Sequence, residues 1–289
     1  MTHIQDEHII EAVGKCEVTI QNGVVTKVGK ATINDCPLAK RFAVPVAEMS
    51  PEAVKANIEM RIKTFGMCTP DRDIYSDEPF VGFGASEIIS SAFKDKGNGA
   101  LIDSAVLACD GAGTVIVTDP RMVQGIGGKM SGLVKTVPYA SVIERIIKGG
   151  GYVLNPDTAE MDPVKGVLLA LQNGFSRPAV TVVSGDAAQH IREICKDAYI
   201  IGVHSTGLSE EDVQKLAASV DLMTACASKA IREVCGSQAL LQAGSGIPVF
   251  ALTQNGKEML LVRMSDIKQP LLVTSATLPV YGNGPDPLI

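Results

Sequence analysis

The feature that most constrains the fold is the alternation of short apolar runs with helical patterns in the second half of the chain. After Pro156, the runs Ala179–Val183 and Tyr199–Val203 flank a helical pattern at Asp186–Cys195, and another apolar run follows at Ile247–Leu252. Strands that alternate with helices of this length are typical of βαβ units, whose strands are parallel and whose helices cover the sheet. The sequence therefore predicts an α/β fold with a mostly parallel, helix-covered sheet in its C-terminal half.

The first half begins with a β-hairpin pattern. Lys15–Ile20 alternates in polarity, Asn22-Gly23 favours a type I′ turn, and Val24–Val28 returns. Three glycines at residues 149–151 break the chain and suggest a boundary. We expect a small N-terminal β-hairpin region packed on a central α/β segment. The expected domains are an N-terminal α/β domain with the hairpin and glycine-rich loops (1–150), a Rossmann-like α/β domain (151–266) and a C-terminal arm (267–289).

One helix has clear signals at both ends. Ser50 precedes Pro51, a combination typical of a helix cap followed by the first helical residue. Apolar residues then recur at helical spacing as far as Phe65, and Gly66 follows as a stop. We therefore expect an amphipathic helix that leads into an irregular loop at residues 67–72.

Composition excludes several classes of protein. The chain of 289 residues has a formal net charge of −6, 4% aromatic residues and no tryptophan, which argues against binding to nucleic acids or to anionic membranes. No apolar run is long enough to span a bilayer, and the polar start at residues 1–7 is unlike a signal peptide. Seven scattered cysteines fit reduced thiols. We expect a cytoplasmic protein.

The stretch Ala105–Gly132 contains two glycine-rich segments beside a strand end. An apolar run ends at Cys109 and Asp110, and a loop rich in glycine follows at Gly125–Gly132. Ligands of open α/β sheets collect beyond the carboxyl ends of strands, and glycine backbones beside a lysine can hold an anion. The alternative is a pair of tight turns that only require positive φ, and the segments match neither a Walker loop nor a Rossmann fingerprint. The predicted residues for a small anionic ligand or cofactor are Gly111, Gly113, Thr114, Gly125, Gly127, Gly128, Lys129, Ser131 and Arg72.

Four cysteines occupy loop or strand-end positions: Cys36, Cys68, Cys109 and Cys226. Thiolates bind zinc, or iron in clusters, when three or four converge, so these four are the predicted metal ligands. No pair has the spacing CxxC, and the alternative is buried, inert thiols. We expect Cys68 and Cys109 to share one site, where Arg72 and Lys129 would lower the thiol pKa values.

Two further segments carry candidate catalytic residues. His204 follows a predicted strand, where it can act as a general base or a metal ligand, or only bond to local backbone. Cys226 precedes a predicted helix together with Lys229, which would favour a reactive thiol, although Ser228 alone explains the segment as a helix cap. The candidate catalytic residues are Cys109, Asp110, His204, Cys226 and Lys229.

Six segments resemble the methanogenesis marker protein eight family. They are Phe65-Gly66-Met67-Cys68-Thr69-Pro70-Asp71-Arg72, Cys109-Asp110-Gly111-Ala112-Gly113-Thr114, Val117-Thr118-Asp119-Pro120, Val123-Gln124-Gly125-Ile126-Gly127-Gly128, His204-Ser205-Thr206-Gly207-Leu208-Ser209-Glu210 and Cys226-Ala227-Ser228-Lys229. The resemblance covers roughly residues 10–264. It implies cytoplasmic residence in a methane-metabolising archaeon or a relative, and a role in methanogenesis through maturation of an enzyme or a metallocofactor. It assigns no catalytic residue.

Three functions follow as hypotheses. The first is binding or handling of a metal centre, such as an iron–sulfur cluster, during enzyme or cofactor maturation. The second is a metal-free transferase that binds a nucleotide-like ligand, with Cys109 or Cys226 as nucleophile and His204 as base. The third is a non-catalytic subunit of a larger complex, docked through the arm. Protein partners or a homo-oligomer are expected in each case.

Overall fold

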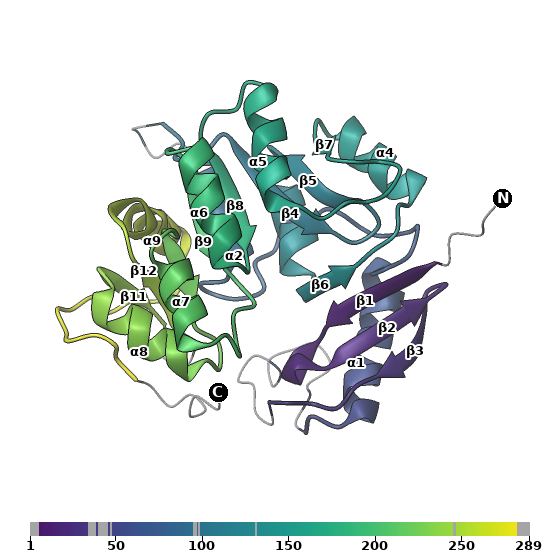
Figure 1. Ribbon diagram of the computed structural model, residues 1–289, viewed down its shortest axis with the longest axis horizontal. Helices are drawn as coiled ribbons and strands as arrows, with labels where there is room; N and C mark the ends of the chain where they lie inside the picture. The colour runs from purple at the N-terminus through teal and green to yellow at the C-terminus, as the bar shows by residue number, and fades with distance from the viewer. Residues whose placement is uncertain are drawn as a thin grey trace.

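The computed structural model describes residues 6–33, 39, 46, 48–94, 97, 99–130, 132–244 and 247–281. The described part contains two β-sheets (Figure 1). The smaller one, sheet A, lies at the lower right of Figure 1 with one helix against it, and the larger one, sheet B, forms the centre of a layered α/β part.

Sheet A has four antiparallel strands in the order β3-β2-β1-β6. The strands are β1 (Glu7–Glu11), β2 (Glu17–Gln21), β3 (Val24–Val28) and β6 (Gly132–Lys135), and the short 3-10 turn η1 (Val13–Lys15) joins the first two. The predicted hairpin is present, with φ of 51° at Asn22 and 72° at Gly23, as a type I′ turn requires. The fourth strand comes from a segment more than 100 residues later.

Helix α1 (Pro51–Phe65) covers one face of sheet A and has the predicted ends. The Ser50 hydroxyl accepts a hydrogen bond from the Ala53 amide at 3.2 Å, and Gly66 ends the helix in a left-handed conformation. Val54 and Ile58 are buried in one cluster with apolar residues of β1, β2 and β3. This packing fixes the direction in which the chain leaves α1 toward residues 67–72.

Sheet B has eight strands in the order β11-β12-β10-β9-β8-β4-β5-β7. They are β4 (Ser104–Cys109), β5 (Gly113–Val117), β7 (Tyr152–Val153), β8 (Pro178–Val182), β9 (Tyr199–Gly202), β10 (Leu222–Thr224), β11 (Leu241–Ala243) and β12 (Val249–Ala251). The four central strands β4, β8, β9 and β10 are parallel to one another, whereas every pairing outside them is antiparallel.

The prediction of a mostly parallel sheet is therefore not confirmed, because three of the seven described pairings are parallel and four are antiparallel. The last predicted strand, β12, runs antiparallel to β10. The sequence analysis missed β11, which lies at the edge of the sheet beside β12. A short connection leads from β11 to β12, and β12 lies between β11 and β10. A connection this short can join only antiparallel neighbours.

Helices cover both faces of sheet B. One face packs against α5 (Pro163–Gln172), α6 (Gly185–Ile194), α7 (Glu210–Ala217) and α8 (Lys229–Gln238); the first three lie in front of the sheet in Figure 1. The other face packs against α2 (Ala85–Ala92), α3 (Pro120–Val123), α4 (Ala140–Lys148) and α9 (Gln254–Asp266). The described part is thus a three-layered α/β unit joined to an antiparallel sheet.

Sheet B takes strands from both sides of residue 150, since β4 and β5 lie beside β7 and β8. The described residues of the arm, 267–281, contain no helix or strand. Their last part is attached to β11, because Val280 and the Gln242 side chain exchange two hydrogen bonds of 2.7 and 2.8 Å. No helix within the described ranges has the length and apolar character needed to cross a membrane.

Candidate functional site

The parallel strands of sheet B end at one edge, called the carboxyl edge below, and each end presents a solvent-accessible residue. Ala108 is exposed near the end of β4, and Val183 is 53% exposed directly after β8. His204 is exposed two residues after β9, and Cys226 is partly exposed two residues after β10. Four neighbouring strand ends thus form an apolar ledge that carries one imidazole and one thiol, at the place where α/β sheets bind ligands.

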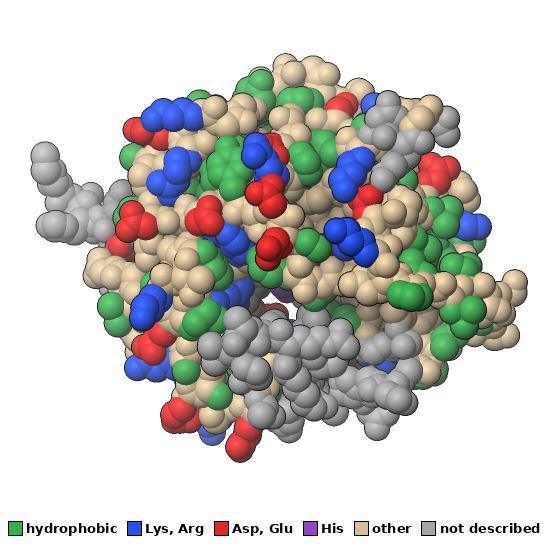
Figure 2. Space-filling view, turned by 180° about the vertical axis from the view of Figure 1, so that it is seen from behind, with side chains coloured by type: hydrophobic (Ala, Val, Ile, Leu, Met, Phe, Trp, Pro, Cys, Tyr) green, Lys and Arg blue, Asp and Glu red, His purple; other side chains and the backbone are tan. Residues whose placement is uncertain are grey.

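Sheet A contacts this edge near His204. Lys15 of η1 donates a hydrogen bond to the Thr206 carbonyl. A Cβ atom at Gly132, the first residue of β6, would lie 3.6 Å from His204 Nδ1. Figure 2 shows an opening near the centre of the opposite face of the molecule, with a histidine side chain visible inside it. The reactive end of the ledge therefore lies close to sheet A.

His204 has a strained backbone and a neutral side chain. Its φ of 52° lies in the left-handed region, which costs about 1–3 kcal/mol for a residue other than glycine. Protein atoms packed around the imidazole lower the pKa of His204 below its usual value, although part of the side chain remains exposed to solvent. An accessible imidazole that is neutral near pH 7 can accept a proton or bind a metal ion.

Cys226 follows the neighbouring strand and is also strained, with a φ of 30°. The Arg232 side chain donates a 2.8 Å hydrogen bond to the Cys226 carbonyl. The Ser228 hydroxyl accepts from the Ile231 amide at 3.2 Å, so Ser228 is the cap of α8, as the alternative reading proposed. Lys229 forms an ion pair with Glu233, and 3.8 Å separate Lys229 Nζ from Glu233 Oε1.

Asp110 is the centre of a buried ion pair. Its Oδ1 accepts from Arg72 Nε at 2.8 Å, and its Oδ2 accepts from the backbone amide of Cys68 at 2.6 Å. Both side chains of the pair are fully buried. The loop after α1 is thereby attached to the end of β4, and Cys68 lies close enough to Asp110 and Cys109 for both to raise the pKa of its thiol.

The structure contradicts the predicted activation of these two thiols. Cys68 and Cys109 are completely buried, and burial together with the Asp110 carboxylate raises the pKa of each thiol well above its usual value. The positive charge of Arg72 acts in the opposite direction but is outweighed. Lys129 is held elsewhere, 2.6 Å from Asp73 Oδ2. The thiols are protonated at neutral pH, a form that neither attacks nor binds metal readily.

Of the predicted metal ligands, Cys68 and Cys109 lie close together, but Cys226 does not join them. Within the described ranges, no three or more His, Cys, Asp or Glu side chains are grouped so that they could hold a metal ion. Cys226 and Cys109 follow strands that are three positions apart in sheet B, which corresponds to about 14 Å at the usual strand spacing. This distance is too long for two sulfur ligands of one metal ion. Cys36 lies outside the described residues.

The glycines at 125–128, which were predicted to hold an anion, lie beside a buried cation. They belong to η3, a π-helix over Gln124–Gly128, and Arg72 Nη2 donates to the carbonyls of Gly125 and Ile126 at 3.1 and 3.3 Å. Carbonyl oxygens rather than amides therefore face the nearest cation. A Cβ at Gly125 would lie 2.2 Å from the Ile74 carbonyl oxygen, so glycine allows close packing there. A Cβ at Gly128 would likewise lie too close to the Phe80 ring, whereas a Cβ at Gly127 would fit. Ser131 lies outside the described residues.

The turn between β4 and β5 is also filled by protein. Gly111 and Gly113 have φ of 84° and 73°, and a Cβ at Gly113 would lie 2.3 Å from the Ala159 backbone. The Thr114 amide donates to the Glu160 carbonyl at 2.8 Å, and its hydroxyl accepts from the Asp162 amide at 2.8 Å. These contacts agree with the tight-turn alternative.

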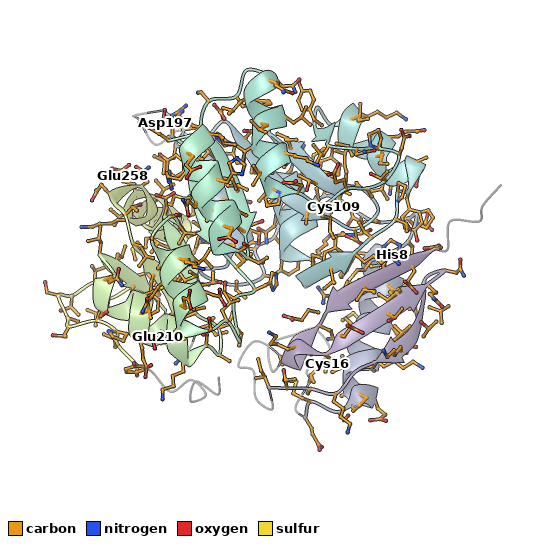
Figure 3. The ribbon with its side chains drawn as sticks, viewed as in Figure 1. His8, Cys16, Cys109, Asp197, Glu210 and Glu258 are labelled. Atoms are coloured by element: carbon orange, nitrogen blue, oxygen red, sulfur yellow. The ribbon has the colours of Figure 1, made fainter. Side chains whose placement is uncertain are left out.

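A buried polar network joins β1 to the same region, and the sequence analysis missed it. His8 is completely buried; its Nδ1 lies 2.9 Å from the Thr136 hydroxyl and its Nε2 lies 2.9 Å from the Tyr139 hydroxyl. Tyr139 donates to Asp6 at 2.6 Å, and Thr136 accepts from the Gly111 amide at 2.8 Å. Figure 3 shows His8 and Cys109 on the two sides of this junction. His8 faces the same side of β1 as buried Ile10, but the sequence Glu7-His8-Ile9-Ile10-Glu11 has no alternation in polarity that would have predicted this.

Burial lowers the pKa of His8, although Asp110 and Asp6 act in the opposite direction. The hydrogen bonds assign the proton of the neutral imidazole to Nε2, since Tyr139 gives its own proton to Asp6 and can only accept from Nε2. The network therefore fixes sheet A against the end of β4 through a His8 side chain that is itself neutral.

Comparison with known proteins identifies the family. Residues 8–265 match the model of a family described as an uncharacterized protein conserved in archaea, DUF2099. An uncharacterized protein of Methanocaldococcus jannaschii is 42% identical over 288 residues, which cover 98% of this chain and 100% of the relative. No solved structure matches the chain. The family match and this relative both span nearly the whole sequence, and the chain therefore belongs to the archaeal conserved family DUF2099.

Proposed function

We propose that the protein is a group-transfer enzyme that acts on a small molecule at the carboxyl edge of sheet B. Cys226 is the nucleophile and His204 is the base. The observation that carries this proposal is that both residues follow neighbouring parallel strands, that both are accessible, and that both have left-handed backbone conformations. Strained residues of this kind concentrate at functional sites.

The chemistry requires only these two side chains and the substrates. Neutral His204 accepts the thiol proton of Cys226, and the thiolate attacks the electrophilic atom of the donor substrate. A bond from Sγ to the transferred group forms, the bond to the leaving group breaks, and His204 returns its proton to the leaving group. In the second half, His204 accepts a proton from the acceptor substrate as the acceptor attacks the transferred group; the bond from the acceptor to the group forms, the bond to Sγ breaks, and His204 returns the proton to the Cys226 thiolate. Ala108 and Val183 provide exposed apolar surface on the same edge of the sheet.

The resemblance described above supports a biological setting for this activity. We propose that the enzyme works in the cytoplasm, in the maturation of an enzyme or cofactor of methanogenesis, and that it associates with a protein partner or with a second copy of itself. A histidine nitrogen and a thiolate are also ligands for zinc and iron. The same two residues can therefore bind a metal-bearing substrate. Metal analysis of the purified protein distinguishes this version of the proposal from the metal-free transferase.

The first test is the reactivity of Cys226 toward iodoacetamide, followed by mass spectrometry as a function of pH. Cys226 should be alkylated in the folded protein while buried Cys68 and Cys109 are not. His204→Gln should slow the alkylation of Cys226 at pH 7 by about tenfold or more, because it removes the base. His190→Gln, on the exposed side of α6, is the matched control and should have no effect. An equal rate in both variants would contradict the role of His204.

The second test is anaerobic purification followed by metal analysis and an absorption spectrum. Protein without stoichiometric metal supports the metal-free transferase. Iron or zinc that is present in the wild type and lost in both Cys226→Ser and His204→Gln would instead support handling of a metal centre at this site.

A further inference from the structure

We infer that the chain forms a homodimer in which residues 270–277 of the arm pair with the same residues of a second copy. This inference rests on the part of the proposed function that gives the protein a partner, and it names that partner and the surface that binds it. It does not depend on the chemistry at Cys226 and His204.

Residues 270–277 are a straight and exposed piece of chain. They contain no helix, strand, turn or bend, and every one of them is exposed. Leu271, Leu272 and Val273 are 44%, 91% and 70% exposed. Adjacent side chains of an extended chain point in opposite directions, so this segment exposes apolar side chains on both of its sides. It forms part of the yellow loop at the left of Figure 1. Apolar surface of this kind marks an interaction site.

The backbone of the segment is also unpaired. The Ser275 carbonyl accepts from the Thr274 hydroxyl at 3.5 Å, and the described residues offer the backbone of 270–277 no other hydrogen bond. Free N–H and C=O groups of an extended chain are able to pair with another strand. Pro270 and Pro279, which have no N–H, limit the length of such a pairing. Residues 271–277 between them are therefore a short strand without a neighbour.

Both ends of the segment are held by the same chain. The arm begins where α9 ends, and beyond the segment Val280 exchanges its two hydrogen bonds with Gln242 of β11. Pro279 packs on α8, because a Cβ at Gly236 would lie 2.8 Å from the proline ring. A segment held at both ends loses little conformational freedom when it binds, which favours association.

The charge of the segment favours a second copy as the partner. Residues 269–281 contain no charged side chain, although the whole chain has a net charge of −6. Two copies of this segment therefore meet without repulsion between like charges. An antiparallel pair of identical strands is also self-complementary. With the two-fold axis at Thr274, Val273 of each copy faces Ser275 of the other.

The surroundings of the segment agree with this arrangement. Leu261 of α9, where the arm begins, is 47% exposed, and Leu240, which precedes β11 where the arm is attached, is 51% exposed. In an antiparallel pair, the beginning of one arm lies beside the end of the other. The α9 side of one copy thus approaches the β11 side of the second copy, and both sides carry exposed leucine. Figure 2 shows hydrophobic side chains on this side of the molecule, at its right.

The test is sedimentation equilibrium of the full chain over a wide range of concentrations. The wild type should sediment as a dimer that dissociates on dilution. Leu272→Glu should raise the dissociation constant of the dimer by tenfold or more, because the pairing then brings two like charges into an apolar contact. Leu168→Glu, which changes a leucine that is 40% exposed on α5, is the matched control and should dimerise as the wild type does. Both variants should keep the circular dichroism spectrum of the wild type.

Thr274→Cys tests the register of the pairing. At the two-fold axis the two copies of residue 274 face each other with Cα atoms about 4.5–5.5 Å apart, a separation that a disulfide spans. Mild oxidation should therefore give more disulfide dimer than the wild type gives, whereas Thr26→Cys, an exposed position on β3, should give no more than the wild type.

Two results would overturn the inference. One is a wild type that stays monomeric at every concentration, and the other is a Leu272→Glu variant that dimerises as tightly as the wild type. The alkylation of Cys226 reports on the proposed chemistry alone. A dimer that depends on Leu272, without an effect of His204 on that alkylation, would leave this inference standing while the proposed function fails.

Discussion

Replacement of Arg72 by methionine should cost much of the stability of the fold. Arg72 and Asp110 are both completely buried, and Arg72→Met leaves the carboxylate without its cation. Removal of one partner from a buried ion pair typically costs about 3–5 kcal/mol. The substitution also removes the donor that serves two carbonyls of the π-helix, which adds to the loss.

A surface pair provides the matched control. Arg121 and Asp119 form an ion pair of similar length, 2.7 Å, but the Arg121 side chain is 57% exposed. Pairs of this kind contribute about 0–1 kcal/mol, so Arg121→Met should change stability by no more than that. At roughly 2–4 °C for each kcal/mol, the melting temperature should fall by about 6–20 °C for Arg72→Met and by at most about 4 °C for Arg121→Met.

The measurement is urea unfolding followed by far-ultraviolet circular dichroism, because the chain has no tryptophan. The double variant Arg72→Met, Asp110→Asn should be less destabilised than the sum of the two single variants, because it contains neither charge of the buried pair and so leaves none unpaired. Stabilities of Arg72→Met and Arg121→Met within about 1 kcal/mol of each other would refute the reasoning.

Three further predictions concern single positions. Gly125→Ala should destabilise by about 1–3 kcal/mol because its Cβ would meet a backbone oxygen at 2.2 Å, whereas Gly127→Ala, with 3.4 Å to its nearest neighbour, should cost nothing measurable in urea. His204→Gly should unfold at the same or a higher urea concentration than the wild type because it relieves a left-handed conformation, and His204→Val should cost about 1–2 kcal/mol; the reverse order would exclude backbone strain. Since burial lowers the pKa of His8, the unfolded chain binds more protons below pH 6.5, and stability should fall by up to about 1.4 kcal/mol per pH unit as the pH drops further. His8→Gln should reduce that slope, and an unchanged slope would show that His8 does not titrate differently on unfolding.

Local signals in the sequence predicted the elements that depend on local physics. The start of α1 at Pro51 and its end at Gly66 follow from a cap residue and a glycine that can adopt positive φ. The hairpin at Asn22-Gly23 follows from the same kind of preference. The strands β8 and β9 were predicted because their apolar runs are bounded by helical patterns, and they pair in parallel as expected.

The features that were missed depend on distant partners. The burial of His8 has no local signal in the sequence, because Thr136 and Tyr139, its hydrogen-bond partners, lie about 130 residues away. The glycines at 125–128 have the same composition in a cradle as in a packed π-helix, and only the contact with Ile74 distinguishes the two. The thiols of Cys68 and Cys109 were expected to be reactive from their neighbours in sequence, but their depth in the fold determines their protonation.

The composition of sheet A has a consequence for synthesis of the protein on the ribosome. Strands β1 to β3 are complete at residue 28, but β6, which covers the outer side of β1, ends at residue 135, or 107 residues later. At about 5–20 residues per second, the growing chain takes roughly 5–20 s to supply that strand. During this interval the edge of β1 has no neighbour, which is the condition under which strands pair with other chains. Strands β1 to β3 of the nascent chain therefore lack β6 until about a third of the gene further downstream has been translated.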